Sequence, residues 1–117
     1  MRHSPSARNF GDRPLIINTP LMAWFVKHYT GNKQLDDPDV TPLLANLENL
    51  PPAFFYVGTQ DPLHDDTVFM ADAYRAAGNE TEVRLYPGAP HGFDGFPIPA
   101  GIDATAAGDY FLARCLG

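Results

Sequence analysis

The chain has 117 residues, a formal net charge of −6, 44% hydrophobic residues and 19% charged residues. This length fits one small domain or part of a larger one, and the composition excludes a disordered tail. The eight Lys and Arg residues are scattered along the chain. This argues against nucleic-acid binding, because phosphate backbones require clustered cations.

No apolar run approaches the roughly 18 residues that a membrane-spanning helix requires, so we expect no membrane span. The first ten residues carry two arginines but no apolar segment follows them, which argues against a secretory signal and favours a cytoplasmic protein. The single cysteine, Cys115, excludes an intramolecular disulfide and a thiolate metal cage. We expect neither a cofactor nor a metal site.

The N-terminal part of the chain predicts a loop over residues 1–18 and a helix over residues 19–30. Thr19 offers a hydroxyl for the N-cap, and Pro20 fits the first helical position, where a missing N–H costs nothing. The apolar stripe of this helix consists of Leu21, Met22, Phe25, Val26 and Tyr29. We expect its aromatic residues to pack against the rest of the chain.

The middle of the chain predicts a strand, a helix and a second strand. Residues 53–58 are apolar with aromatic and β-branched side chains on both faces, which predicts a strand buried on both sides of a parallel sheet. Helical spacing predicts a helix over 66–77, and alternation over 81–86 predicts an exposed or edge strand. Two strands joined by a helix form a right-handed βαβ unit, so the predicted fold class is α/β.

The C-terminal part predicts a Gly- and Pro-rich loop over residues 87–101 and a helix over 103–116. Ala107, Phe111 and Cys115 recur at helical spacing and form an apolar stripe. In such a stripe a cysteine is ordinarily a small buried thiol, so we do not expect Cys115 to replace a nucleophile.

Polar side chains follow both predicted strands. Asp61 comes just after the first strand, and His91 comes just after the second. Functional groups gather at the carboxyl ends of parallel strands, so these two loops are expected side by side. Each residue alone also suits a structural role, Asp61 as a turn cap and His91 as a loop histidine. A carboxylate that holds an imidazole in one tautomer is what a serine hydrolase requires of its acid and its base.

These two segments resemble a known enzyme family. LPPAFFYVGTQDPLHDD and VRLYPGAPHGFDGF are similar to the C-terminal signature of hormone-sensitive-lipase-like bacterial esterases, which are α/β hydrolases. PLMAWFVKHY and the Thr41-Pro42-Leu43 segment extend the resemblance from about residue 4 to residue 116. The resemblance implies that Asp61 is the triad acid and His91 the general base. It also implies a carboxylic-ester hydrolase that acts on acyl esters.

The family's other catalytic motifs are absent from this sequence. It contains neither H-G-G-G nor the nucleophile elbow G-x-S-x-G, and its only serines are Ser4 and Ser6 in the predicted N-terminal loop. The expected fold is therefore a partial α/β-hydrolase fold, a C-terminal βαβα part over residues 1–117 that lacks the N-terminal strands and the nucleophile elbow. Three hypotheses stay open: a C-terminal fragment that is inactive alone, one half of a two-chain hydrolase, and a non-enzymatic interaction module.

The predicted sheet has fewer strands than the apolar character of its first strand requires. The strand over 53–58 expects neighbours on both sides, and this sequence supplies one other strand. An unpaired buried-type strand exposes a hydrogen-bonding edge that favours association. We therefore expect self-association of the chain, or a requirement for a missing N-terminal portion.

Overall fold

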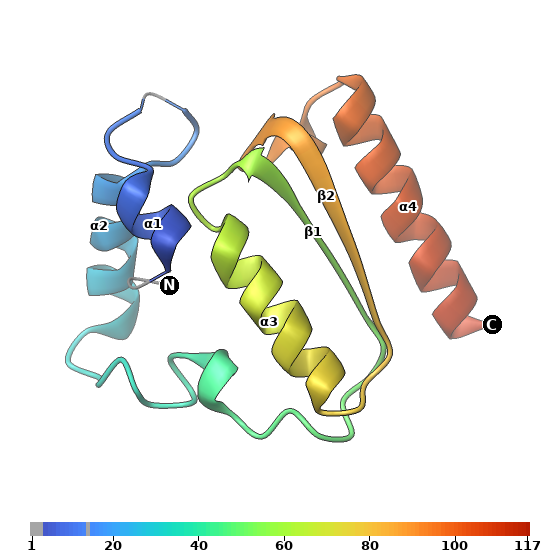
Figure 1. Cartoon of the computed structure of the whole chain (residues 1–117), viewed down its shortest axis with the longest axis horizontal. Coiled ribbons are helices and arrows are strands. Elements are labelled where there is room, and N and C mark those ends of the chain that lie inside the picture. The colour runs from blue at the N-terminus through green and yellow to red at the C-terminus, as the bar shows by residue number, and fades with distance from the viewer. Residues whose placement is uncertain (1–3, 14) are drawn as a thin grey trace.

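The computed structural model describes residues 4–13 and 15–117 (Figure 1). The regular elements in chain order are α1 (Pro5–Asn9), α2 (Thr19–Thr30), the 3₁₀ turn η1 (Pro42–Leu44), β1 (Ala53–Gln60), α3 (His64–Ala76), β2 (Thr81–Pro90), the 3₁₀ turn η2 (Phe93–Gly95) and α4 (Pro99–Leu116). The predicted α/β class is confirmed, since the strands form a parallel sheet with helices beside it.

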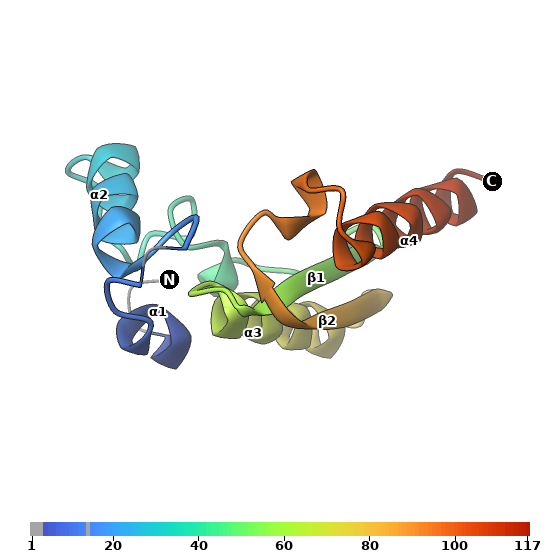
Figure 2. The ribbon, with the colours of Figure 1, turned by 90° about the horizontal axis from the view of Figure 1, so that it is seen from above.

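β1 and β2 form a two-stranded parallel sheet, with Ala53 opposite Thr81 at its start. Figure 2 shows that α3 covers one face of this sheet and α4 covers the other. Side chains alternate between the two faces, as a strand requires. Phe54 stacks on Phe111 of α4 with ring centroids 5.6 Å apart, and Phe55 meets Tyr74 of α3 edge-on at 5.8 Å.

The segment predicted as loop over 1–18 contains a helix, so that prediction is wrong in part. Ser4 caps α1 by accepting the backbone N–H of Ala7 at 3.4 Å, and Pro5 occupies the first helical position. This is the N-cap and proline pattern that a helix start requires, and it is easily missed in a helix of 5 residues. The cap of α2 is Asn18, which accepts the N–H of Leu21 at 3.0 Å, rather than Thr19.

The other elements also differ in their bounds from the predicted ranges. β1 runs to Gln60 and β2 runs to Pro90, because pairing of the two strands resumes after an irregularity in β2. α3 begins at His64, and α4 begins at Pro99, where proline is again the first helical residue. The Gly- and Pro-rich stretch predicted as loop is therefore divided among β2, η2 and α4.

Two predictions about buried side chains are wrong. Trp24 and Phe25 are each 52% exposed and Tyr29 is 78% exposed, because Met22 and Val26 form the inner side of α2. Cys115 is exposed rather than buried. In the last turn of α4 the side chain that faces β2 is Arg114, which bonds Glu80 and Glu82.

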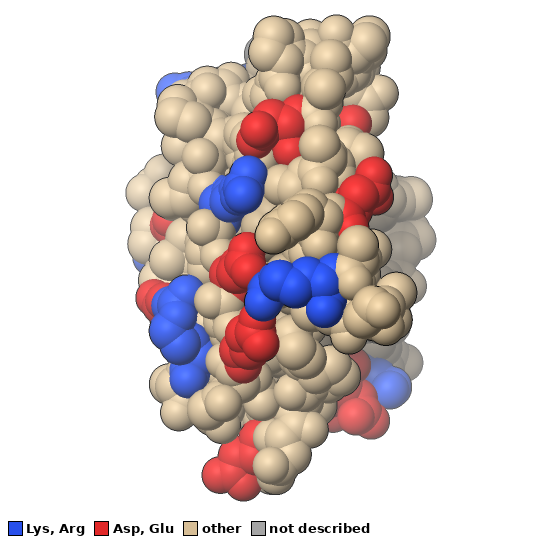
Figure 3. Space-filling view, turned by 90° about the vertical axis from the view of Figure 1, so that its right-hand side faces the viewer, with Lys and Arg blue, Asp and Glu red and all other residues tan. Residues whose placement is uncertain are grey.

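Charges are mixed on the side of the molecule formed by α4. Figure 3 shows cations and anions interspersed there. Arg84 lies 3.6 Å from Asp103, and Arg114 lies 2.7 Å from Glu80. Such a face offers no continuous positive field for a phosphate backbone. Among the described residues, no helix has the length and apolar character that crossing a membrane requires.

Candidate active site

The acid candidate lies where β1 ends. Asp61 directly follows the strand, and its side chain is 7% exposed. One carboxylate oxygen, Oδ1, accepts the backbone N–H of Leu63 at 2.8 Å, which closes a tight turn through Pro62. Proline at this position cannot compete for the carboxylate, since it has no N–H. The turn therefore holds Oδ1 and leaves the second oxygen free for another donor.

The base candidate is brought opposite the acid by an irregularity in β2. Gly58 pairs with Tyr86, but Gln60 pairs with Pro90, so β2 contains extra residues between these two pairs. Gly88 adopts a φ of 75° in this segment, and its N–H donates to the Thr59 hydroxyl at 2.8 Å. Without the irregularity the strands would keep their first register. In that register His91 would lie opposite Leu63, whereas the extra residues keep it back, opposite Asp61, so that it follows Pro90 as Asp61 follows Gln60.

The two candidates form a hydrogen bond. His91 Nδ1 lies 2.9 Å from Asp61 Oδ2. An ionised carboxylate only accepts hydrogen bonds, so Nδ1 carries the hydrogen beside it, and in a neutral imidazole of this tautomer Nε2 keeps its lone pair. His91 is 38% exposed while Asp61 is buried, so the imidazole lies between the carboxylate and solvent. The carboxylate thus holds the imidazole by Nδ1 while the ring remains accessible from solvent.

The His91 loop is anchored by the residues that follow it. Gly92 has a φ of 65°, a left-handed conformation that glycine adopts without strain, and it turns the chain into η2. Phe93 is then 2% exposed and packs against Tyr86 with ring centroids 4.9 Å apart. Tyr56 of β1 donates a hydrogen bond to Asp94 at 3.0 Å. Burial, reinforced by this carboxylate, raises the pKa of Tyr56, so its hydroxyl remains a donor.

The Asp61 loop is held from the N-terminal side of the chain. Ser6 Oγ donates to the carbonyl oxygen of Pro62 at 2.8 Å, and Ser6 also bonds Asp65. The hydrogen bond from His64 to Asp65, at 2.9 Å, lowers the pKa of the Asp65 carboxyl, which therefore stays charged to a lower pH. Sequence reasoning missed these contacts because Ser6 and Asp65 lie 59 residues apart.

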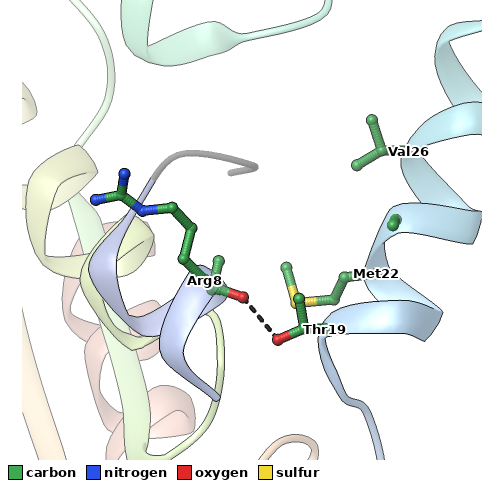
Figure 4. A pocket seen from close by; sticks show the side chains of 6 residues that line it. Arg8, Thr19, Met22 and Val26 are labelled. Atoms are coloured by element: carbon green, nitrogen blue, oxygen red, sulfur yellow. Dashed lines mark hydrogen bonds between the residues drawn. The ribbon is translucent and has the colours of Figure 1, made fainter. Parts of the chain in front are cut away.

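A cleft of about 300 Å³ separates α1 from α2. Figure 4 shows Met22 and Val26 on the side of α2 that faces α1. The Thr19 hydroxyl crosses between the two helices and donates to the carbonyl oxygen of Ala7 at 2.7 Å. The cleft is mainly apolar and belongs to the same N-terminal region that contacts the Asp61 loop.

No group of three or more metal-binding side chains gathers within residues 4–13 and 15–117. The candidate site described above consists of the buried Asp61 carboxylate, the half-exposed His91 imidazole and the loops that hold them. Neither H-G-G-G nor G-x-S-x-G occurs anywhere in the sequence.

A family model described as alpha/beta hydrolase fold matches residues 1–95. The chain belongs to this family. The α/β-hydrolase assignment agrees with the parallel sheet between α3 and α4 and with the polar residues at the strand ends. It also agrees with the resemblance to hormone-sensitive-lipase-like esterases found in the sequence.

Two curated α/β-hydrolase relatives come from Mycobacterium tuberculosis. Carboxylesterase NlhH is 32% identical over 119 residues, which cover 96% of this chain and 37% of NlhH. Esterase LipI is 35% identical over 109 residues, which cover 89% of this chain and 34% of LipI. The chain thus spans about a third of the length of the curated relatives it matches.

Solved structures of esterases and lipases also match this chain over part of their own length. The thermostable carboxylesterase EstE1, cloned from a metagenomic library, matches with a TM-score of 0.77 and 30% identity over 86% of this chain and 36% of its own. A hormone-sensitive lipase from a metagenome library matches with a TM-score of 0.93 over 99% of this chain and 40% of its own. Its 22% identity supports the likeness of fold alone.

Proposed function

We propose that this chain supplies the acid and the general base of a Ser-His-Asp triad in a carboxylic-ester hydrolase. The observation that carries the proposal is the 2.9 Å hydrogen bond between His91 Nδ1 and the buried carboxylate of Asp61. A structural histidine does not require a buried carboxylate that is itself fixed by a backbone N–H. Relatives named carboxylesterase and esterase support the reaction class.

The proposed roles are those of the base and the acid in a Ser-His-Asp triad. His91 Nε2 accepts the proton of the nucleophilic serine hydroxyl as that oxygen attacks the acyl carbonyl carbon. His91 then donates this proton to the departing alkoxide as the ester bond breaks, and water hydrolyses the acyl-enzyme by the same route. Asp61 keeps Nδ1–H in place and stabilises the imidazolium that forms. The acyl ester is the substrate class, and a serine outside this sequence is the nucleophile.

A chain without the nucleophile should be inactive alone. In the proposed enzyme, the serine elbow and the backbone donors for the oxyanion belong to a part of the protein that this sequence does not contain. Removal of the serine from a triad leaves a residual acceleration of roughly 10³–10⁴ over water, which comes from the oxyanion hole and substrate binding. We therefore expect no hydrolysis of p-nitrophenyl acetate by the chain alone beyond that of a His91→Ala control.

A chimaera tests the catalytic roles directly. In the chimaera, this chain replaces the matching third of carboxylesterase NlhH, and the rest of the sequence is that of NlhH. We expect esterase activity that falls by a factor of roughly 10³ or more in His91→Ala and Asp61→Asn chimaeras. The matched control is His28→Ala, since His28 is an exposed histidine of α2 whose Nδ1 lies 2.8 Å from the backbone carbonyl oxygen of Trp24. A folded chimaera whose activity is unchanged by His91→Ala would contradict the proposal.

Two other hypotheses give different outcomes in the same experiment. If the separate NlhH segment regains His91-dependent activity when mixed with this chain, the chain works as one half of a two-chain hydrolase. If a folded chimaera is inactive although its loop at Asp61 and His91 is intact, a non-enzymatic interaction module is favoured and the triad role fails.

A further inference from the structure

The N-terminal helix and the acid loop share a reciprocal pair of hydrogen bonds. The backbone N–H of Asp65 donates to Ser6 Oγ at 3.0 Å, and the backbone N–H of Ser6 donates to Asp65 Oδ2 at 2.8 Å. This is the bonding of a capping box, in which a hydroxyl and a carboxylate each satisfy the other residue's N–H. Here the two partners lie 59 residues apart, so the cap is tertiary rather than local.

α3 needs such an external cap. Leu63 occupies its N-cap position and makes no side-chain cap hydrogen bond. The first N–H groups of a helix have no partner within the helix and require an acceptor. The Asp61 side chain accepts the backbone N–H of Leu63 at 2.8 Å, and the Asp61 carbonyl oxygen accepts the backbone N–H of His64 at 3.1 Å. Ser6 satisfies the next N–H, that of Asp65, so the acid and Ser6 cap the same helix end in succession.

Ser6 also reaches the turn that orients the acid. Its Oγ donates to the carbonyl oxygen of Pro62 at 2.8 Å while it accepts from Asp65. Pro62 is fully buried and lies inside the turn closed by the Asp61 carboxylate on the N–H of Leu63. Rotation of the Pro62 peptide would move that N–H and release Oδ1. The Ser6 hydroxyl therefore opposes the motion that would turn the carboxylate away from His91.

We propose that Ser6 is a positioning residue for Asp61, acting through the Pro62 carbonyl on the hydrogen bond between Asp61 and His91. The importance of Ser6 for catalysis rests on the proposed function. Its effect on the orientation of Asp61 can be measured in this chain without any reaction. A second contact joins α1 to α3 at another point, where the Ser4 hydroxyl donates to the Asp66 carboxylate at 2.9 Å. Substitutions of Ser4 and of Ser6 can therefore distinguish the docking of α1 on α3 from the restraint on the Pro62 turn.

The test measures the His91 imidazole in the full chain without any ester. The downfield ¹H NMR signal of its Nδ1–H is assigned by its loss in Asp61→Asn and His91→Ala, and its rate of exchange with water is measured at fixed pH. The two test variants are Ser6→Val and Ser6→Thr. The introduced side chains have nearly the same shape, but only threonine keeps a hydroxyl. We expect exchange roughly tenfold faster in Ser6→Val, which loses both hydrogen bonds of the hydroxyl, and within about twofold of the original in Ser6→Thr.

Three outcomes would overturn the positioning role. The first is equal exchange in Ser6→Val and the original chain. The second is equal acceleration in Ser4→Ala, which would mean that α1 docking alone matters. The third is loss of the sheet, by circular dichroism, in Ser6→Val but not in Ser6→Thr, which would make Ser6 a folding residue. None of these outcomes depends on esterase activity, so failure of the chimaera and failure of this inference are distinguishable.

Discussion

At Gly58 the two strands approach too closely for any side chain. A Cβ at this position would lie 2.0 Å from the carbonyl oxygen of Ala89, a backbone atom that cannot swing aside. Ala89 belongs to the irregular part of β2 that brings His91 opposite Asp61. Gly58 therefore links the packing of the sheet to the position of His91.

Gly58→Ala should lower the free energy of unfolding by about 1–3 kcal/mol, the usual cost of overpacking, and should also shift the His91 loop. Urea unfolding followed by circular dichroism measures the first effect. The matched control is Gly108→Ala in α4, where nothing lies within 4 Å of the added Cβ. That change should be neutral or stabilise the helix by up to about 1 kcal/mol. Equal stability of the two variants would show that β2 moves freely at Ala89.

At the scale of elements, α4 is attached to the sheet by few side chains. Its buried residues are Gly101, Ala104 and Phe111, and Phe111 stacks on Phe54 of β1. Ala104 belongs to the cluster with Tyr86 and Phe93 behind the His91 loop. Docking of α4 thus supports the His91 loop as well as the sheet.

Phe111→Ala should therefore cost about 3–5 kcal/mol, the range for a buried phenylalanine, and should expose the sheet face under α4. The neighbouring Leu112 is 55% exposed, and Leu112→Ala should change stability by less than about 0.5 kcal/mol. Urea midpoints of the two variants give the comparison. Similar midpoints would mean that α4 contributes little to the fold of this chain.

The sequence predicted the elements whose signals are local. The apolar run of β1 and the polar residues after each strand were sufficient to place Asp61 and His91 at one end of a parallel sheet. The irregularity in β2 was not predictable, because it arises from pairing with β1 and not from the residues of Pro87 to Pro90 alone. The role of Ser6 was missed for the same reason, since its partners lie far away in the sequence and a five-residue helix carries little periodicity.

At the scale of the whole molecule, much apolar surface remains in water. Tyr110 is 70% exposed, Ile102 is 62% exposed and Leu116 is 86% exposed, in addition to the aromatic residues of α2. Within the described residues, β1 pairs only with β2, so each strand keeps one unpaired edge. Unpaired edges and contiguous apolar faces are the features that favour association.

We therefore predict that the isolated chain self-associates. Each 100 Å² of apolar surface withdrawn from water contributes about 2.5 kcal/mol. A small domain is stable by only about 5–15 kcal/mol, so covering these faces changes the free energy of unfolding by a comparable amount. Sedimentation equilibrium should give an average mass above 12.8 kDa that rises with concentration. In the chimaera with NlhH, the sheet edge regains a neighbour and this dependence should weaken. A single 12.8 kDa species that unfolds cooperatively at all concentrations would show that the two strands and their helices suffice alone.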